Sequence, residues 1–161
     1  FILLYVTFGK FRQAGLVLAI VPLALFGGML ALNVRGMTLN VSSAVGFIAM
    51  FGLSIQNGII MVSQVNGLRR GGMELRKSVI EGARQRFRPI LMTSVTTILG
   101  LFPASLATGI GSDVQRPLAT VIVYGLMFST LISMFLLPVF YYLVENNVLN
   151  KKKNDEKEYT I

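Results

Sequence analysis

The stretch VSSAVGFIAMFGLSIQNGIIMVSQVNGL, residues 41–68, contains no charged side chain. A helix needs about 20 consecutive apolar residues to cross roughly 30 Å of hydrocarbon, so this stretch is long enough to span a bilayer. Three further stretches have the same property: residues 14–34, 89–112 and 117–144. The sequence therefore predicts an all-α membrane protein built around a bundle of four full transmembrane helices.

The composition supports this class, since 53% of the residues are hydrophobic and only 14% are charged. Residues 1–8 are apolar but too short to cross a bilayer, so we interpret them as the end of a fifth helix that starts upstream. On the second full span, Ser42/Gly46 and Ser54/Gly58 are pairs of small residues spaced four apart. In lipid, such pairs let helices approach closely.

The basic residues show how the helices are oriented. Every Lys and Arg except Arg35 and Arg116 lies in residues 9–12, in the segment 69–88, or after residue 145. These are the first, third and last connections, which share one side of the membrane if the helices alternate in direction. Because Lys and Arg collect on the cytoplasmic side, we expect these segments and the C-terminus to be cytoplasmic.

Two of these segments carry structural predictions of their own. In the basic loop 69–88, Leu75, Val79 and Ala83 recur every four residues, which predicts a short amphipathic cytoplasmic helix along the membrane surface. Residues 146–161 are polar and low in complexity, which predicts a disordered cytoplasmic tail.

The missing residue types exclude several kinds of chemistry. The chain has no Cys and no His, which removes disulfides, thiolate metal sites and the commonest metal ligand and general base. We therefore predict that it is not an enzyme and carries no cofactor and no metal site. The net charge of +8 is explained by membrane topology, so we predict contact with membrane lipid and not with nucleic acid.

Polar residues inside the spans are the functional candidates, because lipid makes them costly. Gln56 and Asn57 are adjacent on the second full span, and either join helices by hydrogen bonds or border a hydrated ion path. Arg86 and Thr93 share a helix face. Arg86 is either a headgroup anchor or the lip of a proton exit. Thr93 either bonds back to its own helix or belongs to a relay. No carboxylate lies within a span, so the titrating groups of a proton-driven machine would belong to another part of the protein.

Three strings of this sequence carry a family resemblance. Residues 52–62 read GLSIQNGIIMV, residues 84–94 read RQRFRPILMTS, and residues 111–121 read GSDVQRPLATV. The first two resemble the resistance-nodulation-division (RND) efflux permeases, over roughly residues 1–145. The third is similar to the heavy-metal efflux branch of that family.

The resemblance implies that residues 1–145 are the C-terminal transmembrane region, holding the end of helix 8 and helices 9 to 12. It implies a proton-driven homotrimer in the bacterial inner membrane, joined to a periplasmic adaptor and an outer-membrane channel, that exports heavy-metal cations. It also implies that Gln56, Asn57, Arg86 and Thr93 support a proton relay whose essential aspartates lie on the fourth helix. Drug exporters have a Lys where this chain has Gln56, which fits a metal-type member.

Two alternatives remain at this stage. One is a multidrug or amphiphile exporter of the same superfamily. The other is a non-transporting membrane assembly module related to it.

Overall fold

The computed structural model describes residues 2–158, with the side chains of residue 2 and of residues 4–147. The described residues form helices and connecting turns and contain no strand. The helices are α1 (Ile2–Phe8), α2 (Phe11–Val34), α3 (Val41–Arg70), α4 (Leu75–Ser105) and α5 (Ser112–Glu158). Four of them, α2 to α5, are long and apolar enough to cross a membrane. The predicted fold class is confirmed.

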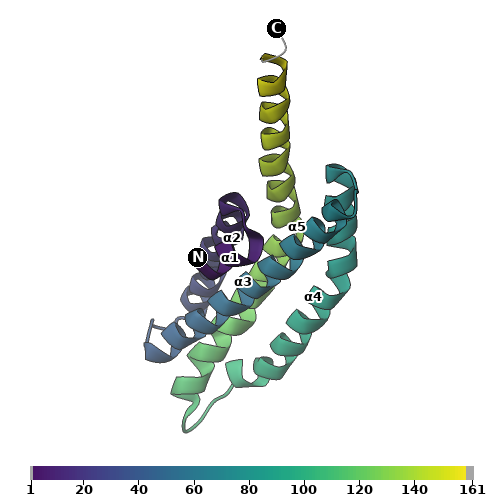
Figure 1. The fold of residues 1–161 in the computed structure, drawn as a ribbon. Coiled ribbons are helices and arrows are strands. Elements are labelled where there is room, and N and C mark those ends of the chain that lie inside the picture. The colour runs from purple at the N-terminus through teal and green to yellow at the C-terminus, as the bar shows by residue number, and fades with distance from the viewer. Residues whose placement is uncertain (1, 159–161) are drawn as a thin grey trace.

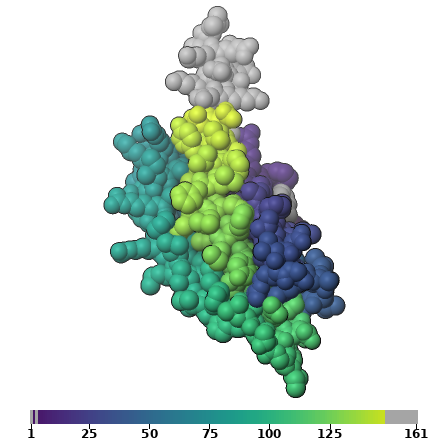
Figure 2. Space-filling model, turned by 180° about the vertical axis from the view of Figure 1, so that it is seen from behind, coloured from purple at the N-terminus to yellow at the C-terminus, as the bar shows by residue number. Residues whose placement is uncertain are grey.

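Helix α5 is the centre of the bundle. It packs against α2, α3 and α4, whereas α1 contacts mainly α2. Figure 1 shows α5 running the length of the molecule, and Figure 2 shows it from behind as a stripe between α4 and α2. The burial of the spans follows this arrangement. In the most apolar 18-residue window of each helix, 61% of α5 is buried but only 11% of α4. Helix α4 therefore presents most of its surface outward.

Small residues allow the close contacts that the sequence predicted. A Cβ on Gly46 would lie 2.9 Å from the carbonyl oxygen of Leu118 in α5, and a Cβ on Gly58 would lie 2.8 Å from Val17 in α2. Hydroxyl pairs join the helices where no water is available. Ser54 contacts Ser129 at 2.7 Å, and Ser94 contacts Thr130 at 2.8 Å. These pairs satisfy polar groups that would be costly if left alone in lipid.

The connections alternate between the two ends of the bundle. At one end, Lys10 and Arg69 both form ion pairs with Glu145, which brings together the α1–α2 turn, the end of α3 and the C-terminal half of α5. At the other end, Arg35 Nη1 donates to the Ser105 carbonyl at 2.8 Å and to the Thr120 hydroxyl at 3.0 Å. The strongly basic segments therefore share one end (Figure 1), as their charge predicted.

Two predicted segments differ from the structure. The basic segment 69–88 is not a long loop with a separate surface helix, because α3 continues to Arg70 and α4 begins at Leu75. The apolar stripe of this segment packs on α3 instead: Leu75 and Val79 are buried, and a Cβ on Gly82 would lie 2.8 Å from Val65. Pro89 lies inside the continuous helix α4.

The tail is the second difference. Helix α5 continues to Glu158, where the sequence predicted a disordered segment from residue 146. Extending an existing helix costs little because its nucleus is already formed, and Lys and Glu are good helix formers. Residues 159–161 of the predicted tail lie outside the described residues.

Candidate functional site

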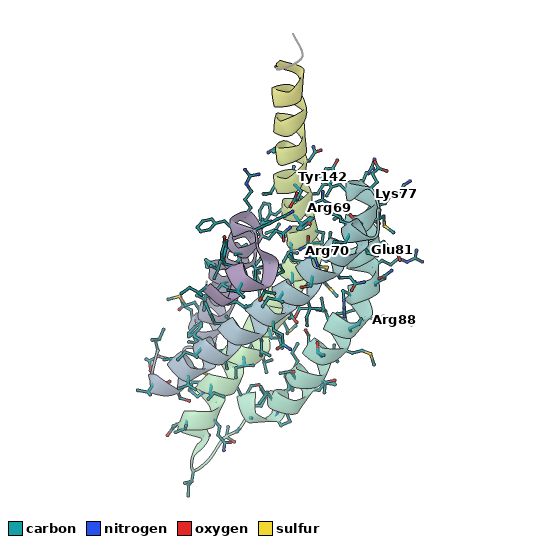
Figure 3. All side chains as sticks on the ribbon, in the orientation of Figure 1. Arg69, Arg70, Lys77, Glu81, Arg88 and Tyr142 are labelled. Carbon is teal, nitrogen blue, oxygen red and sulfur yellow. The ribbon has the colours of Figure 1, made fainter. Side chains whose placement is uncertain are left out.

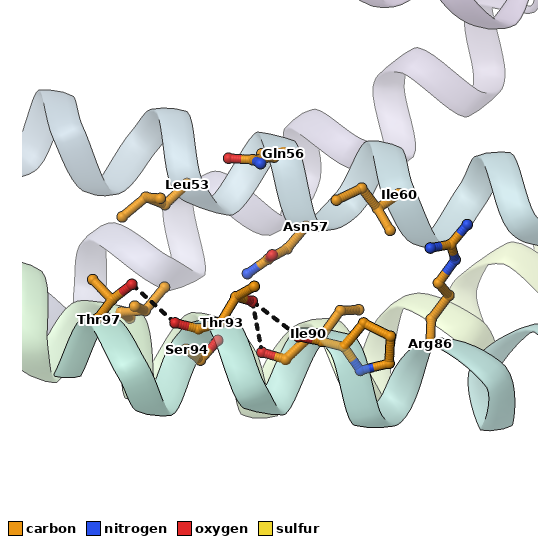
Figure 4. A pocket seen from close by; sticks show the side chains of 11 residues that line it. Leu53, Gln56, Asn57, Ile60, Arg86, Ile90, Thr93, Ser94 and Thr97 are labelled. Atoms are coloured by element: carbon orange, nitrogen blue, oxygen red, sulfur yellow. Dashed lines mark hydrogen bonds between the residues drawn. The ribbon is translucent and has the colours of Figure 1, made fainter. Parts of the chain in front are cut away.

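A pocket of about 180 Å³ lies between α3 and α4 and contains all four predicted relay residues. Gln56 and Asn57 enter it from α3, and Arg86 and Thr93 enter it from α4 (Figure 4). We call it the α3–α4 pocket. The remaining lining residues are Leu53, Ile60, Pro89, Ile90, Ser94, Thr97 and Leu126. The structure thus brings together Gln56 and Thr93, which are 37 positions apart in the sequence.

Arg86 reaches across from α4 to α3. Its Nε and Nη2 atoms donate to Gln64 Oε1 at 3.1 and 2.8 Å. Gln64 Nε2 then donates to Gln85 Oε1 at 2.6 Å, and Gln85 donates to Glu81 at 3.0 Å. This series of hydrogen bonds holds the Arg86 guanidinium at one end of the pocket. The positive charge is fixed there although Arg86 forms no ion pair with the described residues.

The Thr93 hydroxyl is engaged with its own helix. Its Oγ1 lies 3.1 Å from the Pro89 carbonyl and 3.0 Å from the Ile90 carbonyl, to which it donates. The Thr97 hydroxyl likewise donates a hydrogen bond to the Thr93 carbonyl, at 2.9 Å. Pro89 has no N–H, so it leaves a carbonyl of the preceding turn without its usual partner. In this arrangement, Thr93 keeps its lone pairs free to accept a hydrogen bond from the pocket.

Gln56 and Asn57 occupy different environments. Asn57 is buried and points from α3 toward α4 (Figure 4), whereas Gln56 is exposed. Neither amide makes a hydrogen bond to another side chain of the described residues 2 and 4–147. Amides do not titrate, so this pocket can orient water or a neighbouring group but cannot itself take up and release protons.

A second polar cluster, which the sequence analysis missed, lies at the end of the bundle near the α1–α2 turn. Gln13 and Asn66 exchange two hydrogen bonds, at 2.7 and 3.0 Å. The Tyr141 hydroxyl donates to Asn66 Oδ1 at 2.6 Å and lies 3.3 Å from Gln13 Nε2. Gln13 and Tyr141 are almost fully buried, at 1% and 0% exposure. The cluster joins α2, α3 and α5.

Glu145 extends this cluster to charged residues. It accepts a hydrogen bond from Gln13 Nε2 at 3.1 Å and pairs with Arg69 at 3.0 Å and Lys10 at 3.7 Å. Glu145 is 8% exposed, so the two cations offset the cost of removing its carboxylate from water. The sequence analysis included Glu145 as the last residue of the transmembrane region 1–145 and gave it no role.

One signal in the sequence could have identified this cluster. Tyr141 and Glu145 are four residues apart and so share a face of α5, and Asn66 and Arg69 are three apart on α3. Gln13 lies one residue before the charge-free stretch 14–34, so it is not among the polar residues inside the predicted spans. Among the described residues, no group of three or more His, Cys, Asp or Glu side chains could hold a metal ion.

Comparison with known proteins gives consistent matches. The model of the AcrB/AcrD/AcrF family matches residues 1–145. The chain is 41% identical to the cobalt-zinc-cadmium resistance protein CzcA of Cupriavidus metallidurans, over 99% of this chain and 14% of that protein. It is 44% identical to the nickel and cobalt resistance protein CnrA of the same organism, over 84% of this chain and 12% of that protein.

A solved structure agrees with these relatives. The crystal structure of a heavy metal efflux pump, in its second crystal form, shares 52% identity and a TM-score of 0.82, over 90% of this chain and 14% of that one. A more distant match is the toluene efflux pump membrane transporter TtgB of Pseudomonas putida, at 34% identity over 89% of this chain. The chain thus spans about a seventh of the length of CzcA and of the solved pump.

Proposed function

The chain belongs to the AcrB/AcrD/AcrF family, and on that premise we propose that it forms part of a proton-driven permease exporting heavy-metal cations. The observation that carries the substrate class is the identity pattern: 41–44% with proteins named for metal resistance, against 34% with the toluene pump. The GSDVQRPLATV string at residues 111–121, which resembles the heavy-metal branch, supports the same choice.

We propose that the protein is a multi-pass component of a bacterial inner membrane, acting as a homotrimer with a periplasmic adaptor and an outer-membrane channel. The four apolar spans and the family support the membrane location. The basic end of the bundle is then cytoplasmic, because Lys and Arg are retained on that side. The end of α5 that follows Glu145 is then cytoplasmic as well, since Glu145 pairs with Lys10 and Arg69.

The outward surface of α4 suggests how the bundle is coupled to proton movement. Only 11% of its apolar window is buried within this chain, although a polar pocket lies along it. A proton-driven transporter needs carboxylates whose proton affinity changes during the cycle, and the α3–α4 pocket has none. We propose that the carboxylates belong to another helix bundle of the same protein, which packs against this pocket.

The proposed mechanism assigns different tasks to the four residues. Protonation of the partner carboxylates removes their charge and changes how that bundle packs on α3 and α4. Arg86 supplies a fixed positive charge, held by Gln64, that favours the ionised carboxylates. Asn57, Gln56 and the free lone pairs of Thr93 orient the water along which protons move. The resulting helix shift reaches the periplasmic domains and drives metal export.

The decisive variant is Thr93→Ala in the complete gene product, compared with Thr93→Ser, which keeps the hydroxyl. Thr96→Ala is the matched control, since Thr96 is an exposed threonine on α4 that does not line the pocket. We expect Thr93→Ala to lower metal resistance and metal-driven proton flux in proteoliposomes, with Thr93→Ser and Thr96→Ala near wild type. Equal values for Thr93→Ala and Thr96→Ala would remove Thr93 from the mechanism.

The rival function is export of drugs or other amphiphiles, which the match to the toluene pump favours. A strain lacking the gene separates the two. Growth lost on zinc, cobalt, nickel or cadmium, but kept on dyes and detergents, supports metal export. The opposite growth pattern supports the rival.

A further inference from the structure

We propose that the basic end of the bundle holds a binding site for a phosphate group, supplied by an anionic phospholipid. The site is a pocket of about 200 Å³ at the α1–α2 turn, lined by Phe8, Lys10, Gln13, Asn66, Arg69 and Arg70. We call it the basic pocket. It is separate from the α3–α4 pocket and shares no lining residue with it.

The charge of the basic pocket favours an anion. The pocket is lined by three cations, Lys10, Arg69 and Arg70. One carboxylate, that of Glu145, pairs with Lys10 and Arg69. The remaining excess of positive charge is largest at Arg70, which is exposed and forms no ion pair with the described side chains. Figure 3 shows Arg69 and Arg70 together at the end of α3, beside α5. A phosphate oxygen suits an arginine fork through paired, charge-assisted hydrogen bonds.

The pocket is also pre-organised. Gln13 and Asn66 are fixed by their mutual hydrogen bonds and by Tyr141, so the polar wall does not have to be ordered when a ligand binds. Arg69 is held by Glu145 at 3.0 Å, which restrains its rotation. Sites that are fixed in advance lose less entropy on binding. The volume of about 200 Å³ is below the roughly 300–1,000 Å³ of sites for drug-sized ligands, which favours a small group such as a phosphate.

The position in the membrane points to a lipid as the source. Lys10 opens α2, and Arg69 and Arg70 close α3, so the cations stand at the ends of two spans, at the depth of lipid headgroups. Basic pockets between transmembrane helices on the cytoplasmic side bind the headgroups of anionic lipids. Among the described residues that line the basic pocket, Phe8, which is 8% exposed, is the one apolar residue. Free inorganic phosphate has the same chemistry and is the second possible source.

The test uses the complete gene product, purified and placed in lipid nanodiscs. Binding of phosphatidylglycerol is compared with that of phosphatidylcholine by native mass spectrometry, and thermal stability is measured with and without inorganic phosphate. The variant is Arg70→Gln, which removes a cation that makes no hydrogen bond or ion pair with the described side chains. The control is Arg84→Gln, which removes an exposed cation from α4 outside the pocket.

We expect Arg70→Gln to weaken phosphatidylglycerol binding about fivefold, the effect of one basic residue near an anionic surface, and to leave phosphatidylcholine unchanged. Arg84→Gln should bind as wild type does. The Lys10 side chain is 57% exposed. Lys10→Gln should therefore reproduce the Arg70→Gln result, and it tests the proposal if Arg70→Gln folds poorly. Protection of the wild type but not of Arg70→Gln by inorganic phosphate alone would assign the same site to free phosphate. Equal binding of both ligands by Arg70→Gln and Arg84→Gln would overturn the proposal.

Discussion

The replacement Gly46→Ala tests the packing of α3 against α5 most directly. A Cβ at this position would lie 2.9 Å from the Leu118 carbonyl oxygen and 3.2 Å from Val121 Cβ. The nearest obstacle is backbone, which cannot rotate away as a side chain can. The two helices must therefore separate locally, and the contacts around Met50 and Leu126 in the buried interface would loosen.

The magnitude follows from a comparison within the same helix. Gly52 also lies in the interior of α3, and a Cβ there would meet no atom within 4 Å. Replacing glycine by alanine inside a helix stabilises it by roughly 0.5–1 kcal/mol, and this gain applies to both positions. Forcing an extra methyl into a packed interface costs about 1–3 kcal/mol, and this cost applies only to Gly46. The difference between the two variants therefore isolates the packing cost.

Thermal unfolding of the purified protein in one detergent measures this difference. We expect Gly52→Ala to unfold at or above the wild-type temperature, and Gly46→Ala to be less stable than Gly52→Ala by about 1–3 kcal/mol. Equal stability of the two variants would mean that α3 and α5 are not in backbone contact at Gly46, and the packing argument would fail.

Two further predictions concern the basic end of the bundle. Tyr141→Phe removes the hydroxyl that donates to Asn66 at 2.6 Å and should lower the free energy of unfolding by about 1 kcal/mol. The control is Tyr142→Phe, because the Tyr142 hydroxyl has no hydrogen-bond partner among the described residues, and its loss should have no measurable effect. Equal losses in thermal unfolding would argue against the cluster. For topology, single cysteines at residues 72 and 147 should both be protected from an impermeant thiol reagent added to intact cells, and one at residue 109 should be labelled. Labelling at only one of the first two positions would contradict the shared cytoplasmic end.

The sequence identified Gln56, Asn57, Arg86 and Thr93 as candidates, but it did not predict that they line one pocket between α3 and α4. Arg86 and Thr93 are seven apart on α4, close to two turns, and the strings that carry the family resemblance contain all four candidates. The cluster around Gln13 was not predictable in the same way. Its members come from α2, α3 and α5, and no local spacing relates Gln13 to Glu145, which are 132 residues apart.

The sequence by itself determined the number of spans, the bounds of the first two to within a few residues and the shared end of the basic segments. These follow from the solvent: hydrocarbon excludes charge, so uncharged length and the position of Lys and Arg are sufficient. Only the tertiary structure decided that Leu75 to Arg88 belongs to α4 and that Glu145 is buried between Lys10 and Arg69. Such outcomes depend on which helices pass beside one another, because a stripe of apolar residues packs equally well on a membrane surface or on a neighbouring helix until that helix is in place.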